Sequence, residues 1–264
     1  MRVLLFVLWI FGVSAAWAEP LALSHYVGNF LSVDIEIGGQ RAHLLFDTGA
    51  GVTSITPAFA RRIGCMPHGS LTGFRVSGER VSFQKCEGIP IAVSARRAVR
   101  DVAVLDLASI LPADWPPIDG VMGLDVFDGG EMTLHLANRE IDLGHRQGGG
   151  WREGEMRVQR EMGGMGVSAF VRAQASNGSL WMLLDSGNMG PTLLSPGALS
   201  QLRSTAPPSA LSVSGVGSHQ VDATALATAI YDGNLSSAFI RNFEVAIDLR
   251  HNRIWWRPAQ RAQH

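Results

Sequence analysis

The sequence predicts a mostly β chain built from two homologous halves, each of which carries one short helix. Three observations support this prediction: apolar and polar residues alternate between Gly-containing turns, an Asp-hydroxyl-Gly turn occurs twice, and two distant segments match without a gap. With 264 residues, of which 46% are apolar and 17% charged, the chain is able to bury a sizeable core.

The first strands follow from a period of two. Residues 31–37 alternate between apolar and polar side chains, which is typical of a half-buried strand. Residues 38–39 are both Gly and supply the positive-φ positions of a hairpin turn, after which residues 40–46 return. Thr56-Pro57 is typical of a helix N-terminus, and Gly64 predicts where that helix stops.

Further strand pairs are predicted downstream. Residues 73–86 form a hairpin pattern that turns at Ser77-Gly78, which predicts a projecting ribbon. Residues 91–107 alternate again, and a Pro-rich loop at 111–117 follows. Residues 131–143 predict a strand pair that turns near Ala137-Asn138.

The most informative motif is a carboxylate delivered by an apolar strand into a tight turn. Asp47-Thr48-Gly49 follows three apolar residues, and Asp185-Ser186-Gly187 does the same. One such tripeptide is weak evidence, because it also caps helices and forms turns in many folds. Two copies in the same context predict that two carboxylates are brought together.

The repeat is clearest where each half ends. Residues 119–143 lie against 232–256 without a gap, and apolar positions coincide through most of this length. Three matched pairs are Phe127 with Ile240, Leu134 with Ile247, and Ile141 with Ile254. A Gly-rich, charged stretch separates the halves. We therefore expect a signal peptide at 1–18, an N-terminal lobe at 19–147, a linker at 148–160 and a C-terminal lobe at 161–264.

The N-terminus predicts export. Arg2 precedes an apolar run at residues 3–13, and Ala16-Trp17-Ala18 fits cleavage after Ala18. The alternative is an uncleaved anchor that extends through Trp17. With cleavage, we expect a periplasmic or secreted protein without a stable membrane span.

Cys65 and Cys86 are the only two cysteines. In an exported chain, an even number of cysteines predicts a disulfide. Two buried free thiols are the alternative, because the sequence fixes no distance between them.

Several function classes lack their sequence signals. The formal net charge is −1 and no long run of one sign occurs, so we expect no nucleic-acid partner. The chain has no G-x-S-x-G elbow, P-loop, H-E-x-x-H or paired C-x-x-C, and its His residues lack metal-ligand spacing. We expect neither a metal nor a cofactor.

Over the whole mature chain, the sequence resembles the pepsin/retropepsin-like aspartic proteases. The motifs that carry the resemblance are Phe46-Asp47-Thr48-Gly49-Ala50, Leu184-Asp185-Ser186-Gly187, Val121-Met122-Gly123 and the run from Phe239 to Asp248. The resemblance implies a mostly β, bilobal pepsin-like fold made of two homologous retropepsin-like lobes fused in one chain. A monomer would then suffice for activity.

The resemblance also implies roles for individual residues. Asp47 and Asp185 would form the catalytic dyad, and the hydroxyls of Thr48 and Ser186 would cross-link the two turns. Gly49 and Gly187 would let backbone N–H groups approach the carboxylates. The ribbon would be the flap that closes over substrate, with Phe74, Val76, Ser77 and Gly78 as its candidate contacts. Phe74 is equally explained by packing within the ribbon.

The implied function is an aspartic endopeptidase that acts on peptides or proteins through an activated water. A catalytically weak or inactive peptide-binding or inhibitory module is the alternative, motivated by departures from the family pattern. The ribbon has no Tyr, and the repeat places Ser236 where the first half has Gly123, which predicts less regular support at Asp185. Ala50 replaces a hydroxyl residue of pepsin-type enzymes, which predicts activity at milder pH.

Overall fold

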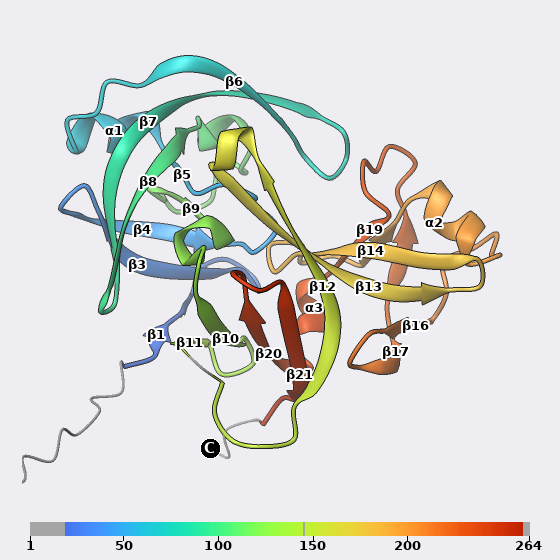
Figure 1. The fold of residues 1–264 in the computed structure, drawn as a ribbon. Coiled ribbons are helices and arrows are strands. Elements are labelled where there is room, and N and C mark those ends of the chain that lie inside the picture. The colour runs from blue at the N-terminus through green and yellow to red at the C-terminus, as the bar shows by residue number, and fades with distance from the viewer. Residues whose placement is uncertain (1–18, 145, 261–264) are drawn as a thin grey trace, which may run out of the picture.

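A computed structural model describes residues 19–144 and 146–260, so the predicted signal peptide at 1–18 lies outside the described residues. The described chain is mostly β, as predicted, and Figure 1 shows its strands and short helices. We call residues 19–144 the first half and residues 146–260 the second half. None of the helices in the described part has the length and apolar character needed to cross a bilayer.

One sheet belongs entirely to the first half. Its strands, in spatial order, are β2 (Ser24–His25), β3 (Leu31–Ile37), β4 (Gln40–Phe46), β9 (Gly120–Met122), β5 (Ser54–Ile55), β8 (Arg96–Val104), β7 (Arg80–Val93) and β6 (His68–Phe74). Because β3 also pairs with β7, the six strands from β3 to β7 close into a barrel.

The second sheet contains strands from both halves. Its order is β1 (Leu21–Ala22), β11 (Glu140–Leu143), β10 (Glu131–His135), β20 (Phe243–Asp248), β21 (Arg253–Pro258), β12 (Arg152–Glu161), β13 (Gly166–Ala175), β14 (Gly178–Leu184), β19 (Gly233–Leu235), β15 (Thr192–Leu194) and β18 (Ala223–Ala225). The hairpin of β16 (Ala210–Val213) and β17 (Gly217–Gln220) joins it through β13.

The helices are short. They are α1 (Pro57–Arg62), α2 (Pro196–Gln201) and α3 (Ser237–Ile240), with 3₁₀ turns η1 (Leu107–Ser109), η2 (Leu124–Phe127) and η3 (Met162–Gly164). The predicted cap is confirmed, because the Thr56 side chain accepts from Phe59 N before α1, and Ser195 caps α2 in the same way by accepting from Ala198 N. The Gly38-Gly39 hairpin is also confirmed, with φ values of 59° and 74°.

The pairing of β10 with β20 relates the two halves by a local two-fold axis. Met132 pairs with Ile247, and Leu134 pairs with Val245. In the sequence repeat, Met132 corresponds to Val245 and Leu134 to Ile247. A two-fold rotation therefore exchanges the pair Met132–Ile247 with the pair Leu134–Val245. The central pair, Thr133 with Ala246, joins two equivalent residues. An axis between these residues is what a self-complementary interface requires.

The segment that the sequence indicated as a linker has regular structure. β12 occupies most of residues 148–160 and pairs with β21 on one side and β13 on the other. Most of its charged side chains are exposed, whereas Gly154 and Met156 are buried. By composition alone, a strand with many charged residues cannot be distinguished from a charged linker. The three glycines at 148–150 also favoured a linker.

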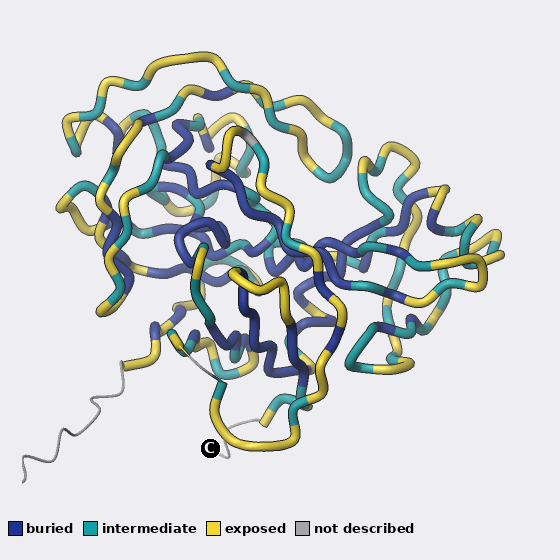
Figure 2. Tube along the Cα trace, viewed as in Figure 1, coloured by how far each residue is buried: buried dark blue, intermediate teal, exposed yellow. Residues whose placement is uncertain are grey.

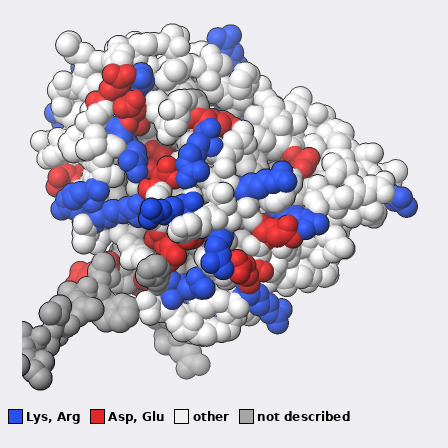
Figure 3. Space-filling view, in the orientation of Figure 1, with Lys and Arg blue, Asp and Glu red and all other residues white. Residues whose placement is uncertain are grey.

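The core is continuous across the two halves. Buried side chains from the barrel, such as Leu44 and Phe59, belong to the same cluster as Val245, Ile247 and Trp256. Figure 2 shows the buried strands at the centre and the more exposed hairpin of β6 and β7 at the periphery. Basic and acidic side chains are interspersed on the face drawn in Figure 3.

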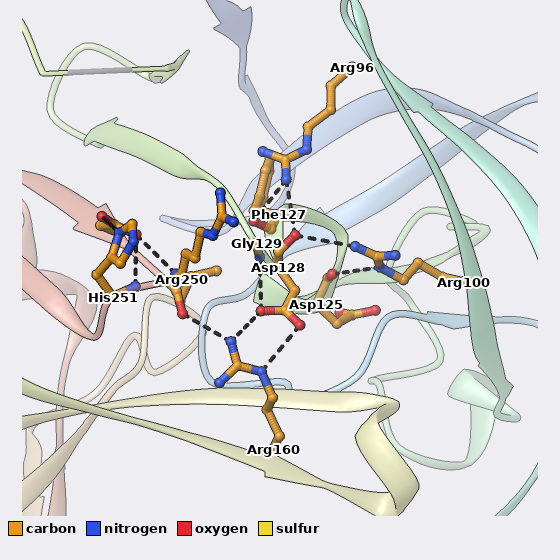
Figure 4. A network of polar contacts seen from close by, with 11 residues as sticks. Arg96, Arg100, Asp125, Phe127, Asp128, Gly129, Arg160, Arg250 and His251 are labelled. Atoms are coloured by element: carbon orange, nitrogen blue, oxygen red, sulfur yellow. Dashed lines mark hydrogen bonds and ion pairs between the residues drawn. The ribbon is translucent and has the colours of Figure 1, made fainter.

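Two arginines cap the carbonyl end of η2, and a third pairs with the carboxylate of Asp128 (Figure 4). Arg96 donates to the carbonyl oxygens of Phe127 and Asp128, and Arg100 donates to those of Asp125 and Asp128. Arg160 of β12 reaches across from the second half and pairs with the Asp128 carboxylate at 2.6 Å. Cationic side chains satisfy carbonyls that a short helix leaves without partners.

Cys65 and Cys86 form the predicted disulfide, with Cα atoms 6.2 Å apart. The bond joins the residues after α1 to β7, so it ties the base of the ribbon to the barrel. Cys86 is fully buried.

Replacing both cysteines by Ala is expected to lower the free energy of unfolding by about 3 kcal/mol, because the unfolded chain regains the entropy of an open loop with a sequence separation of 21 residues. Urea unfolding of the variant and of the oxidised parent would measure this difference. Reduced parent protein is the matched control and should resemble the variant. Equal stability of oxidised and reduced parent would contradict the expectation.

Asp125 is a buried carboxyl beneath the Asp47 turn. Its Oδ1 accepts from the backbone N–H and the hydroxyl of Thr53 at 2.8 and 2.7 Å, and that hydroxyl oxygen accepts from Gly123 N. Its Oδ2 is buried without a hydrogen-bond partner among the described residues. Burial raises the pKa of Asp125 from 3.8 to about 7, against the smaller opposing effect of the Thr53 hydrogen bonds.

This pKa makes stability depend on pH. Because the folded-state pKa is raised, the native state keeps a proton that the unfolded chain releases, so stability falls as pH rises from 3.8 towards 7. The expected slope is about 1.4 kcal/mol per pH unit. Asp125→Asn keeps the oxygen that faces Thr53 and should lose this slope. Chemical denaturation of both proteins from pH 4 to 7 would test it, and parallel curves would contradict it.

Candidate active site

Each Asp of the repeated motif lies just beyond the end of a buried strand. Asp47 follows β4, and its backbone N–H donates to Met122 O at 3.0 Å. Asp185 follows β14, and its N–H donates to Leu235 O at 3.1 Å. In both halves a parallel strand lies beside the strand that carries the Asp: β9 beside β4, and β19 beside β14. The hydrogen bond to that parallel strand fixes the position of the Asp backbone.

The strand register at Asp185 matches that at Asp47, so the expected irregularity is absent from the backbone. It is present in the side chains, because Asp125, which accepts from Thr53, corresponds to Ala238 in the repeat. β14 pairs with β19 in the register with which β4 pairs with β9. Thr192 Oγ1 accepts from Ser236 N at 3.3 Å, as Thr53 Oγ1 accepts from Gly123 N at 3.0 Å. This contact needs only a backbone N–H, which Ser provides as well as Gly.

A second pair of equivalent carboxylates holds the two strands. Asp119 Oδ2 accepts from His43 N at 2.9 Å, and Asp232 Oδ2 accepts from Trp181 N at 2.8 Å. These two Asp residues mark the start of the sequence repeat. Their contacts explain why the repeat begins there, because each fixes the closing segment of its half to the strand that carries the motif Asp.

Thr48 and Ser186 join the two turns through reciprocal hydrogen bonds. The Thr48 N–H donates to Ser186 Oγ, and the Ser186 N–H donates to Thr48 Oγ1, both at 2.9 Å. The Thr48 hydroxyl donates in turn to Leu184 O at 2.7 Å. Both side chains are buried. The cross-link expected from the resemblance is therefore present in the geometry.

The two carboxyl groups meet beside two glycines. Asp47 Oδ1 accepts from Gly49 N at 2.8 Å and from Gly187 N at 3.0 Å, and Gly187 N also lies 3.1 Å from Asp185 Oδ1. A Cβ on Gly49 would lie 2.5 Å from Asp185 Cγ, and one on Gly187 would overlap Asp47 Cγ. No side chain fits at either position, because each glycine backbone packs directly against the opposite carboxyl group.

The environment favours a shared proton. Asp47 Oδ1 and Asp185 Oδ1 both lie within hydrogen-bond distance of Gly187 N, and burial raises the pKa of Asp47. Burial, followed by the charge of Asp47, raises the pKa of Asp185 to about 8. Two adjacent carboxylates cannot both ionise without a large cost, so one proton remains on the pair over a wide range of pH.

Two asparagines in the second half were not predicted as site residues. Asn234 Nδ2 donates to Asp185 Oδ2 at 2.5 Å, and the backbone N–H of Asn188 donates to Asp185 Oδ1 at 3.0 Å. Asn234 is fully buried in β19. The sequence held a signal for it: the repeat aligns Asn234 with Val121, so an amide interrupts an otherwise apolar strand beside the motif Asp.

The ribbon extends from the barrel toward the second half. Ile230 N donates to Val76 O at 3.2 Å, and a Cβ on Gly78 would lie 2.9 Å from Thr228 O. In Figure 1 the tip of this hairpin approaches the loop before β19. Ser77 Oγ accepts from Glu79 N within the turn, and Phe74 is 59% exposed. Ribbon packing therefore does not account for Phe74.

The ribbon base packs on a small separate cluster. Phe83 of β7 lies with Val52 from the Asp47 turn, Ala103 of β8 and Met165 from the connection between β12 and β13. Val167 N donates to Gly51 O at 2.6 Å, which ties β13 to the same turn. Within the described ranges, no group of three or more His, Cys, Asp or Glu is arranged as metal ligands.

Comparison with known proteins locates a family resemblance in the first half. Residues 33–126 match a family model described as aspartyl protease, and this range contains Asp47, the ribbon and Asp125. A search of curated proteins found no match. The matched range and its geometry support an aspartyl protease family of the retropepsin type.

Proposed function

We propose that this protein is an aspartic endopeptidase in which Asp47 and Asp185 activate a water molecule for attack on a peptide bond. The observation that carries the proposal is that two carboxyl groups, from equivalent turns of one chain, lie within hydrogen-bond distance of the same Gly187 N–H. The aspartyl protease match at residues 33–126 supports hydrolase chemistry. The second carboxylate of the proposed pair, Asp185, lies outside the matched range.

The pair has the properties that such a reaction needs. The ionised carboxylate takes a proton from water as the water oxygen attacks the carbonyl carbon, and the protonated carboxyl donates to the carbonyl oxygen. When the C–N bond breaks, the base returns its proton to the amine, while a hydroxyl of the intermediate reprotonates the other carboxyl. Both groups end in their starting states, so no covalent intermediate is required.

The proposal for the lobes and the substrate follows the prediction from the sequence. The catalytic turns would belong to two fused lobes, with one Asp from each, so a monomer would be active. The substrate would be an extended peptide or a protein segment in the periplasm or outside the cell. The ribbon would close over it, and the exposed side chain of Phe74 would supply an apolar contact.

Asp47→Asn and Asp185→Asn should each lower the rate of peptide cleavage by at least about 10³-fold, because the Asn amide can neither accept nor return the transferred proton. Cleavage of a peptide library by the mature protein would measure this. The exposed residues Asp114 and Asp222 supply one matched Asp→Asn control in each half, and both controls should keep parental rates. Peptide binding without Asp-dependent cleavage would instead favour a peptide-binding or inhibitory module.

Gly78→Ala should raise KM several-fold more than Gly69→Ala. Both glycines lie in the same hairpin with φ near 75°, at 79° and 73°, so Ala pays a similar backbone penalty at each. Only the Cβ at position 78 meets the second half, where it crowds Thr228 O and Ile230, whereas that at position 69 meets nothing within 4 Å. Steady-state kinetics on one peptide would compare them. Equal KM values would show that the tip contact is irrelevant to substrate binding.

A further inference from the structure

The two halves of the site differ at one buried position. β9 and β19 are equivalent strands, and Val121 of β9 corresponds to Asn234 of β19. Asn234 has no exposed surface, and its amide nitrogen lies 2.5 Å from Asp185 Oδ2. Val121 offers Asp47 no such donor. A buried amide needs hydrogen-bond partners on both its oxygen and its nitrogen, so its role depends on how it is oriented.

The orientation of Asn234 is fixed by its neighbours. Its Oδ1 accepts from Leu193 N at 3.1 Å and from Asn188 Nδ2 at 3.1 Å. A backbone N–H can only donate, so the oxygen of Asn234 faces Leu193 and its nitrogen faces Asp185. Asn188 is held in turn, because its Nδ2 also donates to Pro191 O and its Oδ1 accepts from Gly190 N.

The consequence is an uneven distribution of donors over the two carboxyl groups. Both oxygens of Asp185 accept N–H groups: Oδ1 from Gly187 and Asn188, and Oδ2 from Asn234. Asp47 accepts two N–H groups, both at Oδ1. In residues 19–144 and 146–260, no N–H group donates to Asp47 Oδ2. Donors stabilise the ionised form of the group that accepts them.

We propose that Asn234 is a positioning residue that keeps Asp185 as the ionised member of the pair and leaves the shared proton on Oδ2 of Asp47. The proposal rests on the proposed function for its catalytic meaning. Burial raises the pKa of both carboxyls, so the pair keeps one proton. The donors decide which oxygen carries that proton.

This assignment divides the reaction between the two residues. Asp185 accepts the proton of the attacking water, while Asp47 gives its proton to the carbonyl oxygen, which forms a neutral tetrahedral diol. In the second step Asp185 returns its proton to the departing amine nitrogen as the C–N bond breaks. One hydroxyl of the diol then gives its proton back to Asp47 as the new carboxyl product forms.

The test replaces the donor with the side chain found in the other half. Asn234→Val should move the acid limb of the pH profile of kcat/KM upward by about one pH unit, because the monoanionic pair loses a hydrogen bond to its charged member. Leu211→Val is the matched control: it truncates a buried side chain of β16, in the same half but away from the two carboxyls, and should leave the limb unchanged. An unchanged limb in Asn234→Val would overturn the proposal.

A second measurement needs neither substrate nor the Val variant. Carboxyl-carbon NMR of the Asp-labelled parent protein, assigned with Asp47→Asn and Asp185→Asn, would identify the group that carries the last proton. We expect Asp47, and finding the proton on Asp185 would overturn the inference. Failure of the proposed function would look different: no peptide would be cleaved although the last proton is found on Asp47.

Discussion

The reciprocal hydrogen bonds between Thr48 and Ser186 impose the main constraint on this structure. Each residue gives its N–H to the hydroxyl oxygen of the other, and the two are 138 positions apart in sequence. Such an exchange is possible only if the two turns are related by a two-fold axis. The pairing of Thr133 with Ala246 likewise joins two residues that the sequence repeat relates. The turns that carry the carboxylates and the strands that join the halves therefore both pair equivalent residues.

The symmetry is broken where the proposed chemistry would need two different groups. A strictly two-fold pair would give both carboxyls the same donors and would leave the proton without a preferred position. Asn234 in place of Val121 changes one side only, and Asn188 in place of Ala50 supplies a side chain that holds Asn234. The backbone scaffold remains equivalent in both halves, because the difference lies in side chains that β9 and β19 present in the same register.

The elements that the sequence predicted well are those set by local chemistry. The Thr56 cap, the Gly38-Gly39 turn and the disulfide partners each depend on short-range rules or on a single possible pairing. β12 was missed because its identity as a strand depends on neighbours far along the chain. Asn234 was missed for the same reason, because its role depends on contact with Asp185, which is distant in sequence. The hydrogen bond between Ile230 and Val76 also joins two segments that no local sequence pattern connects.

The shared sheet has a consequence for how the chain can be divided. β1, β10 and β11 come from residues 19–144, yet they extend the sheet that contains β20, β21 and β12. A break at the Gly-rich segment 148–150 would leave every one of these pairings intact, and Arg160 would still bridge to Asp128. The two fragments would stay associated as a nicked but complete molecule. Expressed separately, each would expose an open strand edge that only the other fragment covers, so they are suited to complementation in trans.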